Sequence, residues 1–433
     1  MAAMTNTSNG MPNGTPDAGS SIHDPQHQAV ISADEIALYD RQIRLWGVQA
    51  QERLRMADVL LIGMRGLGNE IAKNLILAGI NSLTMVDDDL ITEEDTGCQF
   101  LISLEHIGQI RSTACLAAAK ALNPRVKIFS LTLASLLAQP VIFGTYTMVI
   151  ATDLTLSLLT QINIACRLHA RPFYASSTFG MYGFIFADLI QHTYSIKREK
   201  SNISTTLGPE SATRSILSAS TEPRNSEGKL LETVFKSEVY CPINLANTSP
   251  LPAFHLSTRR RKFAVSPILS CIRALWDYQS RTANLSPTHT PADLLLFTTL
   301  AKEKHSELQL PPETLRADTL KSFCQNLSGA ELSPVCAFLG GQVAQDVINV
   351  LGAREQPIQN FVVFDGEEIK GVTYCLWTDM QAAMQEAVSS SSSAQVEAVT
   401  AVGGSEENEV VLADSSLQVG MPASGRSGMV VPV

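Results

Sequence analysis

The chain has 433 residues, of which 45% are hydrophobic and 17% are charged, and its formal net charge is −10. This composition suits two or three globular domains and excludes a fibrous or wholly disordered protein. A general nucleic-acid-binding protein would need a basic face, and the dense basic cluster in this sequence is limited to Arg259–Lys262. We therefore expect no nucleic-acid partner. The cluster indicates either a nuclear import signal or the solvated start of a helix.

Eight cysteines are scattered without a CxxC pair, so the zinc and thioredoxin spacings are missing and no metal site is predicted. We expect reduced, mostly buried thiols. The first 20 residues lack the basic start and apolar centre of a secretory signal. No apolar run reaches the roughly 18–20 residues that span a bilayer. These features predict a nuclear protein, with the cytoplasm as the alternative, and no membrane partner.

Both ends of the chain read as tails. Residues 1–33 and 380–433 are rich in small and polar residues, so we expect both segments to be disordered. Ser32 and Glu35 have the spacing of a capping box. They predict a helix that begins there and continues into the segment Tyr39–Gly47.

A strand–helix–strand unit follows. Residues 57–63 form a short apolar run that ends in glycine, which is typical of a buried parallel strand. Leu67, Ile71 and Leu75 recur with helical spacing and predict a helix. Residues 82–86 predict the next strand, which ends at three consecutive aspartates.

Strands and helices continue to alternate as far as residue 175, which predicts an α/β domain with a parallel sheet and helices on both faces. The pattern then changes, because residues 197–250 read as a flexible loop and residues 259–325 as helices. A helix from Ser333 to Leu351 and a strand near residues 361–366 return to the first pattern. We therefore predict an α/β domain formed by residues 34–190 and 331–379, interrupted by a mainly helical insertion at residues 191–330.

Three glycines mark a candidate nucleotide site. Gly63, Gly66 and Gly68 lie between the first strand and its helix, and Asp87 follows Gly68 by 19 positions. Glycines and an acid in this arrangement are typical of a nucleotide-binding turn. The spacing is GxxGxG instead of GxGxxG, with Arg65 where a glycine normally lets the backbone approach phosphate. The loop alone fits a dehydrogenase, an adenylating enzyme, or glycines that serve only close packing.

Six segments in the right order resemble the ThiF/MoeB/E1 superfamily. They are YDRQIRLWG at 39–47, GLGNEIAKNLILAGI at 66–80, three aspartates followed by QFL at 99–101, HIG at 106–108, ALNP at 121–124, and PVCAFLGGQVAQDVINVLG at 334–352. The resemblance implies a Rossmann-like ThiF-type fold. It also implies an activity in two steps. The enzyme uses ATP and magnesium to adenylate the C-terminal glycine of a ubiquitin-like protein, and the acyl group of that glycine then passes to a cysteine as a thioester.

The chain departs from the active members of this superfamily at the positions that hold ATP. Residues 95–100 read DTGCQF where the active members have Asn-Leu-Asn-Arg-Gln-Phe. Active members have a lysine shortly after HIG, where this chain has Arg111. They also have an arginine between HIG and that lysine, where this chain has Gln109. These changes remove groups that would hold a triphosphate. The chain therefore resembles the adenylation-deficient small subunits of heterodimeric activating enzymes, those for SUMO in particular. The glycines and Asp87 are then the relic of a nucleotide site and bind no ATP.

The resemblance assigns one catalytic residue, Arg41 of the first motif. It would complete in trans the ATP site of a large catalytic subunit, which would hold ATP, magnesium and the catalytic cysteine, with SUMO as the modifier. A surface ion pair is the alternative for Arg41. A NEDD8-type small subunit and a purely structural partner stay open as alternative functions. We expect Cys98, Cys166, Cys271 and Cys336 to be core thiols.

Overall fold

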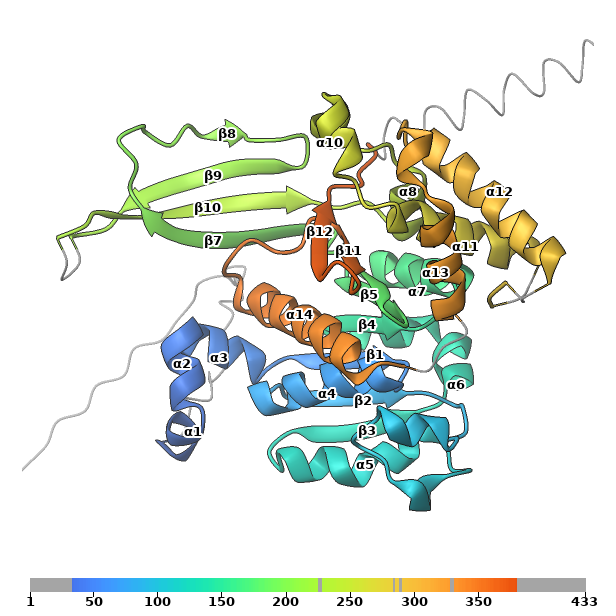
Figure 1. Cartoon of the computed structure of the whole chain (residues 1–433). Helices are drawn as coiled ribbons and strands as arrows, with labels where there is room; N and C mark the ends of the chain where they lie inside the picture. Colours follow the sequence, from blue (N-terminus) through green and yellow to red (C-terminus); the bar gives the residue numbers. More distant parts are fainter. Residues whose placement is uncertain (1–32, 225–227, 283–284, 288–289, 328–330, 380–433) are drawn as a thin grey trace, which may run out of the picture. The chain divides into compact units, whose positions relative to one another are not determined.

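The computed structural model describes residues 33–224, 228–282, 285–287, 290–327 and 331–379. Its main sheet has eight strands in the order β12-β11-β6-β5-β4-β1-β2-β3 (Figure 1). The strands are β1 (Asp58–Ile62), β2 (Ser82–Val86), β3 (Lys127–Leu131), β4 (Met148–Thr152), β5 (Phe173–Phe179), β6 (Tyr182–Asp188), β11 (Phe361–Asp365) and β12 (Lys370–Tyr374).

The α/β class is confirmed, but the main sheet is mixed and not wholly parallel. Strands β1 to β5 pair in parallel. Strands β6, β11 and β12 join in antiparallel pairs. Strand β6 follows β5 after a turn at Gly180 and Met181, and a turn this short can only reverse the chain. Strand β6 was not predicted from the sequence.

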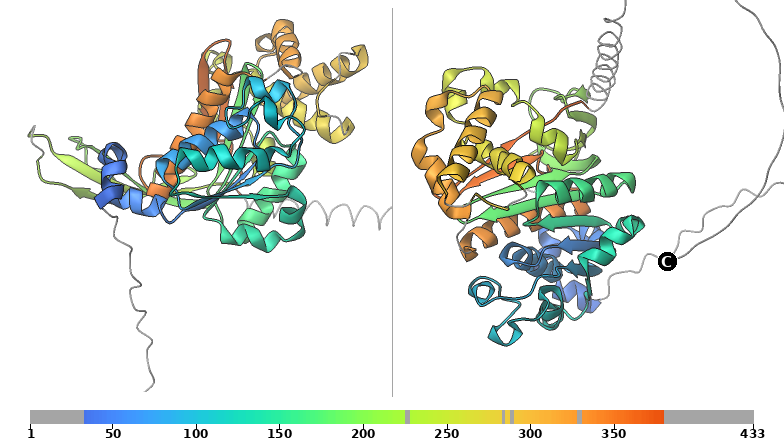
Figure 2. Two further views of the ribbon diagram at one scale, coloured as in Figure 1. Left: turned by 90° about the horizontal axis from the view of Figure 1, so that it is seen from below. Right: turned by 90° about the vertical axis from the view of Figure 1, so that its right-hand side faces the viewer.

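Helices cover both faces of this sheet, as predicted (Figure 2). Side chains of β1 alternate between two hydrophobic clusters, with Leu60 and Ile62 in one and Val59 and Leu61 in the other. The second cluster includes side chains of α4 (Gly66–Ala78), α5 (Arg111–Leu122) and α14 (Ser333–Gly352). The first includes side chains of α6 (Leu133–Ala138), α7 (Leu156–Leu168), α11 (Ile268–Thr282), α12 (Pro291–Glu307) and α13 (Ala317–Leu327).

Helix α14 is long and apolar enough to cross a membrane by length and composition alone, which the sequence analysis did not anticipate. However, 61% of its apolar window is buried inside the protein. It packs closely on α4, since a Cβ atom at Gly340 would lie only 2.6 Å from the Cβ of Glu70. The apolar character of α14 is therefore explained by its place in the core.

A second sheet occupies much of the segment that we expected to be a flexible loop. Its order is β7-β10-β9-β8, and its strands are antiparallel. They are β7 (Gln191–Glu199), β8 (Gly208–Pro209), β9 (Arg214–Thr221) and β10 (Leu231–Val239). The loop prediction was wrong because these strands are rich in Ser, Thr, Lys and Glu, and only pairing with each other makes them regular. The later part of the insertion is helical, as predicted, and also contains α8 (Ile243–Thr248), α9 (Ala253–Leu256) and α10 (Arg259–Phe263).

Three short helices precede β1, and we call them the N-terminal arm (residues 33–54). They are α1 (Ala33–Leu38), α2 (Asp40–Trp46) and α3 (Val48–Leu54). The sequence predicted one helix into this region, but the chain bends at Tyr39 and again at Gly47, whose φ of +85° suits glycine. Ser32 of the predicted capping box lies outside the described residues, as do residues 1–32 and 380–433 of the predicted tails.

Candidate functional site

The glycine loop (residues 63–68) joins β1 to α4 and leaves no room for side chains at two of its glycines. A Cβ atom at Gly63, where φ is +91°, would lie 2.4 Å from the carbonyl oxygen of Thr152. A Cβ atom at Gly68 would lie 2.1 Å from the carbonyl oxygen of Gly63. The glycines therefore allow the first turn of α4 to pack directly against the ends of β1 and β4.

Asp87, at the end of β2, fixes the glycine loop and pairs with a buried arginine. Its Oδ2 atom accepts a hydrogen bond of 2.8 Å from the amide of Met64. Nη1 of Arg111 lies 2.9 Å from both carboxylate oxygens of Asp87, and Nη2 donates to Asp95 at 3.1 Å. Arg111 thus faces these two buried acids, with the exposed carboxylate of Asp89 at 3.5 Å, and not an empty anion site. We call Asp87, Asp95 and Arg111 the acid–arginine cluster.

The members of this cluster are all buried, where the one guanidinium offsets part of the charge of the two carboxylates. Arg111 is 4% exposed, Asp87 8% and Asp95 6%. Burial alone would lower the pKa of Arg111, but the charges of Asp87 and Asp95 outweigh it and raise that pKa above its usual value. Arg111 therefore remains a cation and neutralises the carboxylate that a nucleotide-binding protein of this type would offer to a ribose.

A second carboxylate lies at the start of α4. The amide of Gly66 donates to both oxygens of Glu331 at 3.1 Å. Nε of Arg65 lies 3.6 Å from the same carboxylate, and Nε2 of Gln99 lies 3.4 Å from it. The free amides at a helix N-terminus are where anions bind. Glu331 therefore supplies an anion from within the chain at the position where the predicted site would meet phosphate.

Sequence reasoning missed Glu331, which lies 265 positions from Gly66 and belongs to no motif that we singled out. It also missed Asp153, which follows β4 and lines a polar cavity of about 90 Å³ together with Arg65 and Glu331. An acid directly after an apolar strand at the carboxyl edge of a parallel sheet was the available signal. Burial first, and then the charge of Glu331, raise the pKa of Asp153 to about 7.

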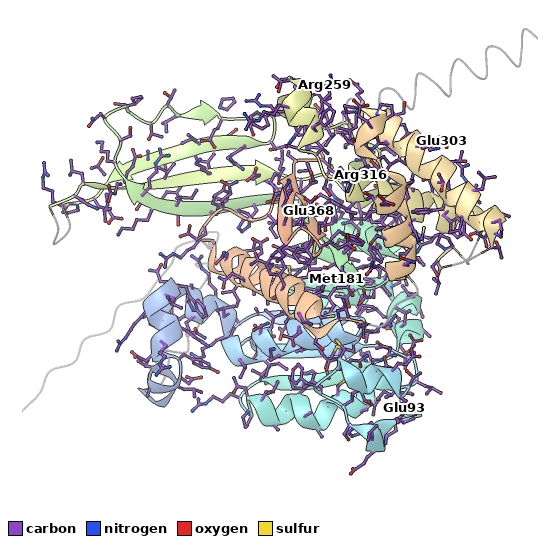
Figure 3. All side chains as sticks on the ribbon, in the orientation of Figure 1. Glu93, Met181, Arg259, Glu303, Arg316 and Glu368 are labelled. Atoms are coloured by element: carbon purple, nitrogen blue, oxygen red, sulfur yellow. The ribbon has the colours of Figure 1, made fainter. Side chains whose placement is uncertain are left out.

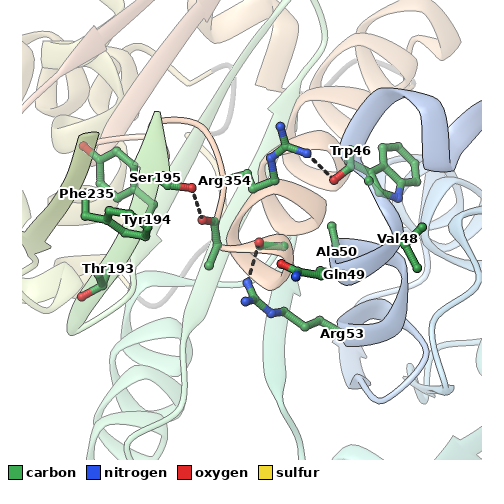
Figure 4. Close-up of a pocket in the computed structure, with 13 residues that line it drawn as sticks. Trp46, Val48, Gln49, Ala50, Arg53, Thr193, Tyr194, Ser195, Phe235 and Arg354 are labelled. Atoms are coloured by element: carbon green, nitrogen blue, oxygen red, sulfur yellow. Dashed lines mark hydrogen bonds between the residues drawn. The ribbon is translucent and has the colours of Figure 1, made fainter. Parts of the chain in front are cut away.

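The first motif is anchored on both sides of Arg41. Before it, the buried hydroxyl of Tyr39 accepts a hydrogen bond of 2.9 Å from Asn123. After it, the guanidinium of Arg354 donates to the carbonyl oxygen of Trp46 (Figure 4). Arg53 of α3 also donates to the carbonyl oxygen of Gly352 at 2.7 Å. These bonds fasten the N-terminal arm to α5 and to the end of α14.

Arg41 itself is exposed on α2, and the structure assigns it no hydrogen bond or ion pair with any described residue. Its neighbour Arg44 differs, because it pairs with Asp40 at 2.8 Å. The surface ion pair that we considered for Arg41 is therefore formed by Arg44. Arg41 lies on α2, whereas the glycine loop joins β1 to α4 (Figure 1), and the structure gives no contact between Arg41 and the described residues of the loop.

A cavity of about 470 Å³ lies beside the N-terminal arm. Figure 4 shows Trp46 and Arg53 of the arm on one side and Tyr194 and Phe235 of the second sheet on the other. The cavity therefore lies against the bend at Gly47 and α3, between the arm and the second sheet.

The other residues that the sequence analysis considered are placed as follows. Cys166, Cys271 and Cys336 are buried and Cys98 is half-buried. The basic cluster forms α10, where Arg259 projects from the surface (Figure 3) and pairs with Glu313 at 3.2 Å. Both Arg261 and Lys262 also have hydrogen-bond partners within the protein. The helix start that we considered for this cluster is confirmed, and the nuclear location stays a prediction.

The ThiF family matches residues 39–386 of this chain. The chain belongs to the ThiF family. This match begins at Tyr39, so that it includes Arg41, the glycine loop and Glu331, and it extends through the insertion. The superfamily resemblance that rested on six motifs is thereby confirmed.

Several curated ThiF relatives are similar over most of their length. The DNA damage tolerance protein RHC31 of Saccharomyces cerevisiae is 35% identical over 340 residues, which are 78% of this chain and 95% of that protein. SUMO-activating enzyme subunit 1 of Homo sapiens is 32% identical over 354 residues, 80% of this chain and 96% of that protein. The subunit of the same name from Xenopus laevis is 33% identical over 354 residues, 81% of this chain and 98% of that protein.

Proposed function

We propose that this chain is the small, non-cysteine subunit of a heterodimeric E1 that activates SUMO by ATP-dependent adenylation and thioester formation. Relatives named SUMO-activating enzyme subunit 1 align with about four-fifths of the chain at 32–33% identity. The single observation that carries the proposal is a contrast in charge. The nucleotide crevice, by which we mean the glycine loop with Asp87, Asp95, Arg111, Asp153 and Glu331, is filled by the chain's own charged side chains. The guanidinium of Arg41, in contrast, is exposed and unpaired among the described residues.

The first part of the proposal is that this chain binds no ATP. A triphosphate at the N-terminus of α4 would meet the carboxylate of Glu331, which is 3.1 Å from the amide of Gly66 and only 10% exposed. Bringing polyanionic phosphate to a nearly buried carboxylate is unfavourable in a medium of low dielectric constant. The ribose-binding acid is also engaged, because Asp87 is paired with Arg111. Gly63, Gly66, Gly68 and Asp87 then serve the fold. ATP and magnesium would bind in the large subunit.

The second part is that Arg41 acts in trans on the ATP of the large subunit. A guanidinium that reaches a neighbouring subunit's triphosphate stabilises the negative charge that develops as the phosphate bond breaks. Arg41 suits this role because Tyr39 and Trp46 hold its helix in place while its own side chain stays free. A rigid support of this kind limits the entropy lost when the guanidinium docks.

The third part is the pairing surface itself. The N-terminal arm exposes large apolar side chains, among them Leu45 of α2, which is 76% exposed. A second group lies in the segment that follows β2, where Leu104 is 66% exposed. Large apolar side chains exposed in groups mark an interface, and obligate interfaces are more apolar than the rest of a protein's surface. The full set comprises Ile36, Leu38, Leu45, Val48, Leu90, Phe100, Leu104, Ile107 and Ile110.

ATP:pyrophosphate exchange tests the proposal directly. The full chain would be assayed alone and then co-expressed with the large subunit of a SUMO-activating enzyme, each with a panel of ubiquitin-like proteins. We expect exchange from the pair only, and only with SUMO. In the pair, Arg41→Ala should slow exchange by about tenfold or more, whereas Arg44→Ala on the same helix should leave it nearly unchanged.

Each alternative outcome has a distinct meaning. Exchange by the chain alone would refute the proposal that this chain binds no ATP. Exchange with NEDD8 and its large subunit would select the NEDD8-type alternative. If Arg41→Ala leaves exchange unchanged while size-exclusion chromatography shows an intact pair, the chain is a structural partner without a catalytic arginine.

A further inference from the structure

We propose that Cys98 and Cys336 form a redox modification site, in which a hydroperoxide converts the two thiols into a reversible disulfide. Cys98 follows the short 3₁₀ turn Glu94–Gly97, and Cys336 lies in the first turn of α14. Although 238 positions separate them in sequence, their Sγ atoms lie 3.7 Å apart. This inference is independent of the proposed function.

The geometry needs little change to form the bond. A disulfide has an S–S length of about 2.05 Å, so each sulfur has to move by less than about 1 Å, which small side-chain rotations can supply. Both sulfurs face Gly66, since a Cβ atom there would lie 2.6 Å from Sγ of Cys98 and 3.1 Å from Sγ of Cys336. The absent side chain of Gly66 leaves the space in which the two thiols meet.

The two cysteines differ in the ways that the chemistry requires. Cys98 is half-buried, so a small oxidant can reach it, whereas Cys336 is buried behind it. A hydrogen bond from Cys336 lowers the pKa of Cys98 to about 7, and the hydroxyl of Ser333 acts in the same direction. Burial and the charges of Glu331 and Glu70 oppose this shift. Cys98 is thus the attacking thiolate and Cys336 the resolving thiol.

The reaction balances with one hydroperoxide. The thiolate of Cys98 attacks the O–O bond of hydrogen peroxide and, with one proton, gives a sulfenic acid and water. The thiol of Cys336 then attacks the sulfenic sulfur, forming the S–S bond and releasing a second water with the remaining proton. Two thiols and one peroxide yield one disulfide and two waters, and a dithiol reductant reverses the change.

No other described cysteine combines these properties. Cys375 is also half-buried, but burial raises its pKa. Cys115, Cys166, Cys241, Cys271 and Cys324 are buried, and burial raises the pKa of each. Cys375 therefore offers a matched control, because its exposure is similar and its reactivity should be lower.

The test uses the reduced full-length chain and hydrogen peroxide at neutral pH. Free thiols would be counted with and without peroxide, the remaining thiols blocked, and the disulfide located by peptide mass spectrometry without reduction. We expect the count to fall from eight to six, with Cys98 joined to Cys336, and to return to eight with dithiothreitol. Cys98→Ser should slow thiol loss by about tenfold or more, and Cys375→Ser should leave it unchanged.

Either of two results would overturn the proposal. One is a disulfide between other cysteines as the main product. The other is conversion of Cys98 to sulfinic acid while Cys336 stays reduced. Because Cys336 is buried, Cys336→Ala serves as the second variant. If it folds, as judged by circular dichroism, Cys98 should accumulate as sulfenic acid that a dimedone probe traps. No trapping would count against Cys336 as the resolving thiol.

Discussion

The nucleotide crevice and the N-terminal arm handle arginine in opposite ways. In the crevice, Arg111 is buried and makes contacts of 2.9 and 3.1 Å with the two acids Asp87 and Asp95. In the arm, Arg41 projects from an anchored helix and has no partner among the residues that the structure describes. An arginine therefore stabilises the fold in the crevice, whereas an arginine in the arm is available to another molecule. Motif spacing alone could not separate these two uses.

The sharpest test of this comparison removes each arginine in turn. Arg111→Ala would leave Asp87 and Asp95 buried without their cation, which should lower the free energy of unfolding by about 3–5 kcal/mol. Arg41→Ala removes an exposed side chain and should change that free energy by less than about 0.5 kcal/mol. Urea unfolding of both variants measures the difference. Equal effects would mean that the two arginines do not differ as the structure indicates.

The packing of α14 against α4 can be tested with two adjacent glycines of α14. A Cβ atom at Gly340 would lie 2.6 Å from the Cβ of Glu70 and 3.3 Å from the carbonyl oxygen of Leu67, so Gly340→Ala should push α14 away from α4 and cost about 1–3 kcal/mol. At Gly341 such a Cβ would meet no described atom within 4 Å beyond its own stretch of helix. Gly341→Ala should therefore stabilise the helix by up to about 1 kcal/mol. Thermal melts of the two variants should shift in opposite directions, and a shift in the same direction would contradict this packing.

Much of the α/β framework could be predicted because its central strands are buried on both faces. The runs that became β1 and β2 are mostly apolar, and the glycines and helical spacing between them define α4. Strand β6 was missed although it is equally buried, because it follows β5 after only two residues and no turn signal was recognised there. The strands of the second sheet were missed for a different reason. Residues 231–239 mix acids, lysine and serine with apolar residues without a regular alternation, and they become a strand by pairing with residues 191–199.

The candidate site was predictable as far as its motifs reached. Gly63, Gly66, Gly68 and Asp87 were expected in one place, and the structure brings them together around the loop. The sequence did not predict that the anion position of this loop is occupied. The carboxylate there belongs to Glu331, which the tertiary fold brings to Gly66 from 265 positions away. The departures from the active family pattern indicated a lost phosphate site, but they did not indicate that the chain supplies an anion of its own.

The crevice should also give the protein a pH dependence that the arm cannot give. Unfolded Asp153 ionises near its ordinary pKa of 3.8, whereas burial and then Glu331 raise the folded value to about 7. Between these values the folded state holds more protons, so raising the pH destabilises the protein. Asp153→Asn keeps the acceptor for the amide of Thr178 and cannot ionise. Its advantage over the wild type should grow from pH 4 to pH 7, reach at most about 4 kcal/mol and then level off. Urea unfolding across this range measures it, and parallel profiles would contradict it.

The smallest effect on the isolated chain is expected at Leu45, in the arm. Its side chain is 76% exposed, so Leu45→Lys should change the free energy of unfolding by no more than about 0.5 kcal/mol. If the arm is a pairing surface, the same change should weaken association with the large subunit, because a lysine would have to lose its hydration at an apolar interface. Ile203, 82% exposed between β7 and β8, is the matched control, and Ile203→Lys should affect neither quantity. Calorimetric titration of each variant with the large subunit compares the two sites, and equal affinities would place the interface away from the arm.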